Sequence, residues 1–155
     1  PDAITIKWPN DLLVSTRKLG GVLVESRPVG ASTRAFAIGV GINCLQQSAH
    51  WPAELRGRAT SLEIESERAV DRVVVARALL TALAAWLCDP SAWDDEQLKT
   101  AWVARASILG QRIRLRFDGR EYAGSAIDID PSAGLLVELD RGRRQYFDPA
   151  RTTLL

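Results

Sequence analysis

The sequence predicts an α+β fold, in which a mixed or antiparallel sheet with packed helices is followed by a small SH3-like β-barrel. Three observations support this. Short apolar runs broken by turn residues occupy the first 44 residues, helical periodicity follows them, and from Gln111 onward the apolar period changes to two. A length of 155 residues suffices for one ordinary domain plus a small module. We therefore expect a first domain at residues 1–107 and a barrel at residues 108–155.

Four strands are expected in the first domain. Turn signals such as Pro9-Asn10-Asp11 separate runs of strand-forming residues. Gly39 and Gly41 alternate along the fourth strand, so both point to one face. They leave either a shallow floor for a ligand or room for a packed helix. The expected strands span residues 3–8, 12–14, 18–26 and 34–44.

Two helices are expected after the sheet. Apolar residues recur at helical spacing over residues 68–87 and trace an amphipathic face, and Asp89-Pro90 ends this helix. Asp94 or Asp95 can cap a second helix over residues 96–106, which Gly110 ends. The helical residues with core-like spacing are Leu98, Trp86, Trp93 and Trp102.

The barrel is predicted from five short strands in fewer than fifty residues. Residues 113–117 alternate apolar and basic side chains, and Asp118-Gly119 is a strong hairpin turn. Arg112, Arg114 and Arg116 form the solvated face of the first of these strands. The expected strands span residues 113–117, 122–129, 135–139, 145–147 and 152–155.

Composition narrows the classes of function. The 20 Lys and Arg nearly balance the 19 Asp and Glu, which argues against nucleic acid as a partner, and no apolar run is long enough to span a membrane. Cys44 and Cys88 lack metal-ligand spacing, so we expect buried free thiols in a reducing compartment, the cytoplasm, and no metal site. His50 is expected at the surface. The chain contains no Met, so we expect a fragment of a longer protein.

Two neighbouring motifs are the most specific features of the sequence. Lys7-Trp8-Pro9-Asn10-Asp11 is followed by Arg17-Lys18-Leu19-Gly20-Gly21. Taken singly, the first could be a plain turn and Lys18 a solvated strand residue. In this order and spacing they strongly resemble biotin–protein ligases, which attach biotin to a lysine of carboxylase carrier domains. The resemblance continues through Ile38–Asn43 and Ala59–Leu62 and covers essentially the whole chain.

The resemblance implies both fold and activity. Residues 1–107 would be the C-terminal part of a class II synthetase-like catalytic domain, and residues 108–155 the terminal barrel. Biotin and ATP, with Mg²⁺, would give biotinyl-5'-AMP, and a lysine of the biotin carboxyl carrier protein would accept the biotin. A homodimer stays open. Two alternatives also stay open: a lipoate–protein ligase-like acyltransferase, and a non-catalytic module that docks the carrier.

The resemblance also assigns roles to residues of the first motifs. Lys18 would contact the biotin carboxylate and the adenylate phosphate, where two anions meet and fixed positive charge is needed. Gly20 and Gly21 would let the ligand lie against the backbone. Asp11 would orient the acceptor lysine and help to take its proton.

Further contacts are implied for the nucleotide. Asn10 would face a phosphate or a magnesium-bound water, Lys7 the triphosphate, and Asn43 the nucleotide, although Asn43 could equally cap its strand. Trp51 could cover adenine or simply be a loop aromatic. The Gly/Arg-rich loop typical of the family is absent from these residues, so we expect half a site that is inactive alone. The family's closing Ser-Gly-Glu-Val is replaced by residues 147–151.

Overall fold

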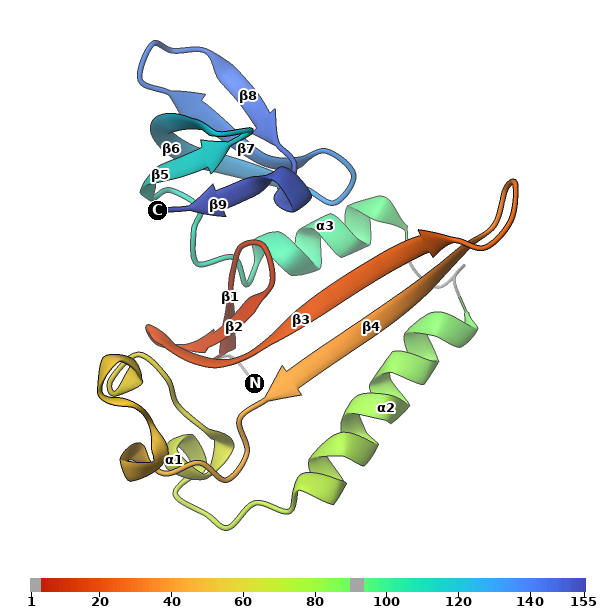
Figure 1. Ribbon diagram of the computed structural model, residues 1–155, viewed down its shortest axis with the longest axis vertical. Helices are drawn as coiled ribbons and strands as arrows, with labels where there is room; N and C mark the ends of the chain where they lie inside the picture. The colour runs from red at the N-terminus through yellow and green to blue at the C-terminus, as the bar shows by residue number, and fades with distance from the viewer. Residues whose placement is uncertain (1–3, 90–93) are drawn as a thin grey trace. The chain divides into compact units, whose positions relative to one another are not determined.

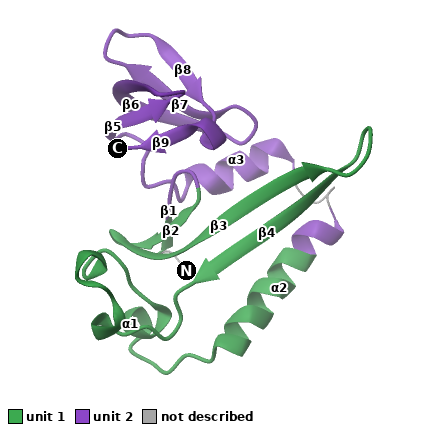
Figure 2. Cartoon of the chain, in the orientation of Figure 1, with its two compact units in different colours: residues 1–5, 10–84 green, residues 6–9, 85–155 purple. Residues whose placement is uncertain are grey.

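The computed structural model describes residues 4–89 and 94–155, and the chain divides into two compact units (Figures 1 and 2). The first unit comprises residues 1–5 and 10–84, and the second comprises residues 6–9 and 85–155. Each unit is built on one sheet, and helices are few. The predicted α+β class is therefore confirmed.

A four-stranded sheet carries the residues of the two motifs. Its strand order is β1-β2-β3-β4. β3 and β4 form a long antiparallel hairpin, seen in Figure 1, whose register runs from Gly20 opposite Ile42 to Pro28 opposite Arg34. All four expected strands are present; Ala3, placed at the start of the first, lies outside the described residues. The strands are β1 (Ile4–Lys7), β2 (Asp11–Val14), β3 (Arg17–Pro28) and β4 (Arg34–Ile42).

A short helix that the sequence analysis did not predict follows the sheet. α1 (Leu62–Ser66) is only five residues long. Its N-cap is Ser61, whose hydroxyl accepts a hydrogen bond from the Ile64 amide at 3.3 Å. This satisfies one of the amides that a helix start leaves without an intrahelical partner. Two 3₁₀ turns, Ser48–His50 and Ala53–Leu55, precede it.

The two expected helices are present with shifted ends. α2 (Arg72–Cys88) begins four residues later than predicted. α3 (Asp95–Val103) is capped by Asp94, one of the two predicted caps, which accepts a hydrogen bond from the Gln97 amide at 2.7 Å. The prediction that Gly110 ends this helix was wrong. The helix stops at Val103, and Gly110 instead occupies a turn with φ of +76°.

The expectation that the first long helix packs into a core was wrong for α2. None of its residues is buried, and Val73, Leu80 and Leu87 are each about 60% exposed or more. Trp86 is 40% exposed, so its core-like spacing was also misleading. Trp93 lies outside the described residues. The amphipathic period predicted the helix but not what covers its apolar side.

The second unit is built on a five-stranded antiparallel sheet of the SH3-like type, with strand order β8-β7-β6-β5-β9. Asp118 and Gly119 both have positive φ, as the predicted hairpin turn between β5 and β6 requires. A last 3₁₀ turn, Pro149–Arg151, precedes β9. The strands are β5 (Arg112–Phe117), β6 (Arg120–Asp130), β7 (Gly134–Leu139), β8 (Arg144–Phe147) and β9 (Thr152–Leu154).

The core of this unit contains a residue of the first motif. Trp8 is 1% exposed and clusters with Leu115, Phe147 and other buried residues, and Trp102 packs against them. Trp8 therefore supports the fold of the second unit, while its neighbour Lys7 is exposed. Leu98 is half-buried. Burying an indole of this size contributes roughly 3 kcal/mol or more.

The charged and histidine residues that were expected at the surface are exposed, whereas the two cysteines are less buried than expected. The basic stripe of β5 is solvated as predicted, with Arg114 and Arg116 paired to Glu121 at 3.1 Å. His50 is exposed, as expected. The expectation of buried thiols was wrong for Cys88, which is exposed, and too strong for Cys44, which is partly buried; both are free. Among the described residues, no helix is long and apolar enough to cross a membrane.

Candidate active site

A surface hollow of about 700 Å³ brings together most of the residues singled out from the sequence. It lies on the four-stranded sheet, where β2, β3 and the end of β4 meet. Six residues implied by the resemblance line it: Asn10, Asp11, Lys18, Gly20, Gly21 and Asn43. The seventh, Lys7, belongs to the second unit, so its proposed contact with a triphosphate stays a prediction.

Lys18 and Asp11 form an ion pair in this hollow. The Lys18 Nζ lies 2.5 Å from Asp11 Oδ1, and the two side chains are 51% and 27% exposed. An ammonium has three N–H donors, so Lys18 can hold Asp11 and still offer donors to a bound anion. The pair therefore presents positive charge and a carboxylate at the same point of the hollow.

A break in the β2–β3 ladder sets the direction of Lys18. Leu12 pairs with Gly20, but Leu13 pairs with Lys18, so the register skips Leu19. Without this shift, Lys18 and Gly20 would lie on the same face of the sheet, because side chains alternate along a strand. The extra residue turns Lys18 to the face of Asp11, as bulges near active sites commonly do. Leu19, 2% exposed, is buried.

The two glycines after Leu19 have different reasons to lack a side chain. A Cβ on Gly20 would lie 2.3 Å from the carbonyl oxygen of Gly41, so Gly20 permits the close approach of β3 and β4. A Cβ on Gly21 would lie 3.3 Å from Asp11 Oδ1 and 3.8 Å from Lys18 Cε. Gly21 therefore leaves space for the ion pair itself.

Gly39 and Gly41 provide the open floor of the hollow. A Cβ added to either would meet no atom closer than 3.7 Å. Both residues are exposed, so no helix packs against them in the described structure. Of the two explanations considered for this pair, the shallow floor agrees with the structure.

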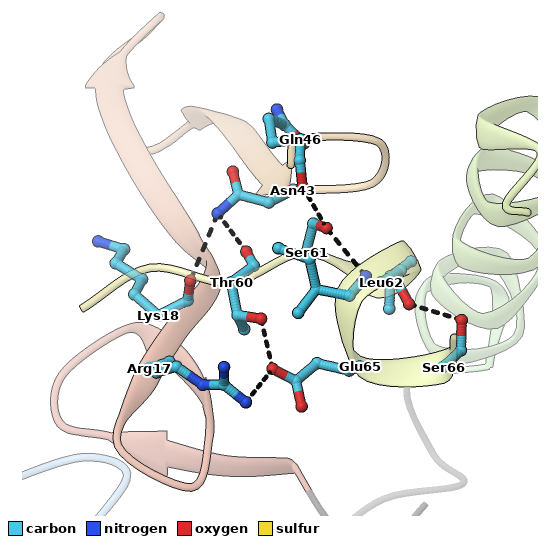
Figure 3. Close-up of polar contacts among 10 residues, drawn as sticks. Arg17, Lys18, Asn43, Gln46, Thr60, Ser61, Leu62, Glu65 and Ser66 are labelled. Atoms are coloured by element: carbon cyan, nitrogen blue, oxygen red, sulfur yellow. Dashed lines mark hydrogen bonds and ion pairs between the residues drawn. The ribbon is translucent and has the colours of Figure 1, made fainter. Parts of the chain in front are cut away.

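The side-chain nitrogen of Asn43 is hydrogen-bonded within the protein. Its Nδ2 donates to the carbonyl oxygens of Thr60 at 3.0 Å and Lys18 at 3.4 Å (Figure 3). Its backbone amide donates to Leu19 at 2.8 Å. A contact between the Asn43 side-chain oxygen and a nucleotide stays a prediction. The structure adds a second role for Asn43, because its side-chain nitrogen holds the backbone of Lys18.

Sequence reasoning missed a polar network next to the hollow (Figure 3). Glu65 of α1 accepts a hydrogen bond from the buried Thr60 hydroxyl and pairs with Arg17 Nη2 at 2.8 Å. Ser61 donates to the Gln46 carbonyl at 2.7 Å. Thr60 and Glu65 are five positions apart, a spacing with no known sequence signature, so only the fold reveals this contact.

A second hollow of about 720 Å³ lies farther along the β3–β4 hairpin. Glu25, Arg27 and Phe36 are among its lining residues. No ion pair joins Glu25 and Arg27 among the described contacts, and none of the predicted site residues lines it. Its size alone gives no chemical role, so the hollow at Lys18 is the candidate active site.

Candidate metal ligands are few in the described structure. In residues 4–89 and 94–155 there is no group of three or more His, Cys, Asp or Glu that could hold a metal ion. The hollow offers the Asp11 carboxylate and the Asn10 carbonyl group as oxygen donors. Such a set suits Mg²⁺ that arrives bound to phosphates, which needs only one or two protein ligands.

The sequence matches two family descriptions. Residues 2–43 match the Biotin/lipoate A/B protein ligase family, and residues 108–148 match the Biotin protein ligase C terminal domain. The chain belongs to the biotin protein ligase family. The first match contains the complete Lys18 and Asp11 constellation, and the second covers most of the SH3-like sheet.

Curated members of the family are similar over nearly all of the chain. The Bifunctional ligase/repressor BirA of Bacillus spizizenii is 33% identical over 142 residues, which is 92% of this chain and 44% of that protein. The Biotin--[acetyl-CoA-carboxylase] ligase of Paracoccus denitrificans is 31% identical, over 91% of this chain and 59% of that protein. The chain thus spans about half the length of these relatives.

Solved structures of the family share the fold. The apo biotin protein ligase from Aquifex aeolicus superposes with a TM-score of 0.81 and 24% identity, covering 98% of this chain and 65% of that chain. The same protein in complex with biotin and ATP gives a TM-score of 0.80 and 23% identity, covering 98% and 62%. The arrangement of sheets and helices is therefore that of biotin protein ligases.

Proposed function

We propose that the protein to which this chain belongs is a biotin–protein ligase. It would join biotin to ATP as biotinyl-5'-AMP and transfer the biotin to a lysine of a biotin carboxyl carrier protein. The observation that most directly supports this proposal is the Lys18–Asp11 ion pair. It lies beside exposed glycines in a hollow of about 700 Å³. The names of the relatives support the same activity.

The first reaction needs positive charge at the meeting point of two anions. A carboxylate oxygen of biotin attacks the α-phosphorus of ATP, the P–O bond to the β-phosphate breaks, and pyrophosphate leaves. Charge accumulates on the phosphoryl oxygens in the transition state. The Lys18 ammonium, kept in place by Asp11 and by its backbone contacts, is a preorganised donor for that charge.

The second reaction needs a neutral amine aimed at the adenylate. The acceptor lysine nitrogen attacks the acyl carbon, an amide forms, and AMP leaves. The amine must lose a proton, and a carboxylate can orient the ammonium form and assist that loss. Asp11 lines the same hollow as Lys18, which supports this role beside the adenylate.

We propose that Mg²⁺ binds together with ATP. Asn10 and Asp11 would hold it through their side-chain oxygens, and the ion would neutralise phosphate charge when bound. Asn10 is exposed at the rim of the hollow, ahead of Asp11 in the chain. No preformed cage is required, because substrate phosphates and water would supply the remaining ligands.

Lipoate ligation is the second candidate, because the first family match covers biotin and lipoate ligases together. The match of residues 108–148 to a biotin protein ligase domain favours biotin. To separate them, the full-length protein is incubated with ATP, carrier domain and each acid, and the carrier is weighed by mass spectrometry. A mass gain with biotin alone supports the proposal. A gain with lipoate alone, or with neither acid, contradicts it.

Substitution of Lys18 tests whether its charge contributes to biotinyl-adenylate formation. In the full-length protein, Lys18→Ala should lower the rate of biotinyl-adenylate formation by about 10²–10³-fold, because a preorganised charge is lost. Arg27→Ala is the matched control, an exposed cation farther along β3. It should leave the rate unchanged. An equal rate for wild type and Lys18→Ala would remove Lys18 from the mechanism.

A further inference from the structure

The backbone of Lys18 is held by the segment before α1, which is distant in sequence from the motif that contains Lys18. The Lys18 amide donates to the Arg58 carbonyl at 2.8 Å, and the Thr60 amide donates to the Lys18 carbonyl at 2.9 Å. Lys18 and Ala59 form a parallel bridge. Residues 58–60 therefore lie beside β3 at Lys18, and the Asn43 amide group joins the two backbones.

Glu65 fixes this arrangement through side chains. It accepts from the Thr60 hydroxyl and pairs with Arg17, and Figure 3 shows both residues directed toward it. Thr60 is fully buried, and the side chains of Arg17 and Glu65 are 39% and 19% exposed. We call these three residues the Glu65 clamp. In the same view the Lys18 ammonium points away from the clamp.

The clamp acts on Lys18 through its two backbone neighbours. Arg17 precedes Lys18 in β3, and adjacent side chains of a strand point to opposite faces. Thr60 is bonded to the Lys18 carbonyl, so each end of the clamp is attached to the Lys18 backbone. A charged acceptor makes both hydrogen bonds stronger than neutral ones, and the buried Thr60 hydroxyl would otherwise be left without this partner.

We propose that Glu65 is a positioning residue for Lys18. By holding Arg17 and Thr60 from the face opposite the hollow, it keeps the Lys18 ammonium aimed at Asp11 and at an incoming phosphate. This inference rests on the proposed ligase function, but the contact it describes can be tested separately. A displacement of about 1 Å at a reacting group can cost on the order of 10²-fold in rate.

The activity test uses the full-length protein and a double-mutant cycle. Glu65→Ala should lower kcat for biotinyl-adenylate formation between about 10-fold and 100-fold, with a smaller change in KM for biotin. Glu65→Gln, which keeps an acceptor for Thr60, should lose less. Glu54→Gln, an exposed glutamate of the preceding 3₁₀ turn, is the matched control and should retain wild-type kcat.

The cycle distinguishes positioning from simple destabilisation. In a Lys18→Ala background, Glu65→Ala should reduce the residual rate by less than 2-fold, because the group it positions is gone. A merely structural role would give the same fold loss in both backgrounds. That result, or an unchanged kcat for Glu65→Ala, would overturn the inference.

Amide hydrogen exchange tests the clamp without catalysis. In the full-length protein, Glu65→Ala should accelerate exchange at the Lys18 and Thr60 amides by at least about 10-fold, while the barrel amides remain unchanged. Unchanged exchange at both amides would contradict the clamp. If wild type makes no biotinyl-adenylate, the ligase proposal fails, and the exchange result still decides whether Glu65 holds Lys18 in place.

Discussion

At the scale of single residues, two glycines of the β3–β4 hairpin, Gly20 and Gly39, differ in how much space a side chain would have. The Cβ of Gly20→Ala would meet the Gly41 carbonyl at 2.3 Å, whereas the Cβ of Gly39→Ala would have ordinary contacts at 3.7 Å. We expect Gly20→Ala to lower the free energy of unfolding by about 1–3 kcal/mol and Gly39→Ala to change it by under about 0.5 kcal/mol. Urea unfolding of the full-length variants measures both. Equal losses would show that the β3–β4 approach does not require Gly20.

Gly21 is expected to affect activity more than stability. Its substitution by Ala places a methyl group 3.3 Å from Asp11 Oδ1, tighter than most contacts, so the ion pair with Lys18 must shift. The hollow is open, and the pair can move outward at little cost in folding. We predict that Gly21→Ala slows biotinyl-adenylate formation by about 10-fold or more while the urea midpoint changes little. A variant with wild-type kcat would show that the pair tolerates displacement.

These residue roles show where sequence reasoning stops. Asp11, Lys18 and Asn43, which the resemblance singled out, line one hollow in the structure, and their roles there stay predictions. It could not predict the register shift at Leu19, because a skipped residue depends on the pairing of β2 with β3 and leaves no compositional sign. Glu65 was missed for a similar reason, since its partners come from β3 and from the segment before α1.

At the scale of elements, the β5–β6 hairpin carries a charge cluster with a defined pH dependence. Hydrogen bonds from Arg116 and Arg114 hold the pKa of Glu121 below its ordinary value of 4.5. The folded state therefore binds this proton less readily than the unfolded chain. The resulting stabilisation is present above pH 4.5 and is lost as the pH falls through the folded pKa.

The Glu121 prediction is tested by titration. The carboxyl carbon of Glu121, followed by NMR in the full-length protein, should titrate with a midpoint below 4.5. In the Arg114→Gln/Arg116→Gln double variant the midpoint should move up toward that value. Because the cluster is exposed, high salt should reduce the difference. A midpoint at or above 4.5 in the wild type would contradict the geometry of the cluster.

Element prediction succeeded where the pattern is local and failed where it depends on neighbours. The nine strands of the described residues were all predicted from apolar runs and turn residues, and Asp94 was one of two candidate caps. The apolar side of α2 was expected to be buried, yet Val73, Leu80 and Leu87 are exposed. The apolar period shows that one side of a helix is apolar, but that side is buried only if another element packs against it.

At the scale of the whole molecule, the hollow is walled from one side. Its described lining comes from β2 to β4 and the adjoining residues Asn10 and Asn43, and the Lys18 side chain is 51% exposed. Electrostatic stabilisation of a transition state is strong where water is excluded and weak where it is not. The relatives are about twice as long as this chain. We infer that the remaining part of the protein supplies the other wall.

The isolated chain should therefore be inactive although its motifs are intact. We predict that the 155-residue chain forms no measurable biotinyl-adenylate, and that it binds biotin at least about 100-fold more weakly than the full-length protein, because its hollow is lined by one sheet and leaves Lys18 half exposed to water. Single-turnover adenylation and calorimetry on both proteins measure this, with circular dichroism to confirm that the chain is folded. Measurable adenylation by the folded chain would contradict this prediction and show that one wall, with Lys18 and Asp11, is sufficient.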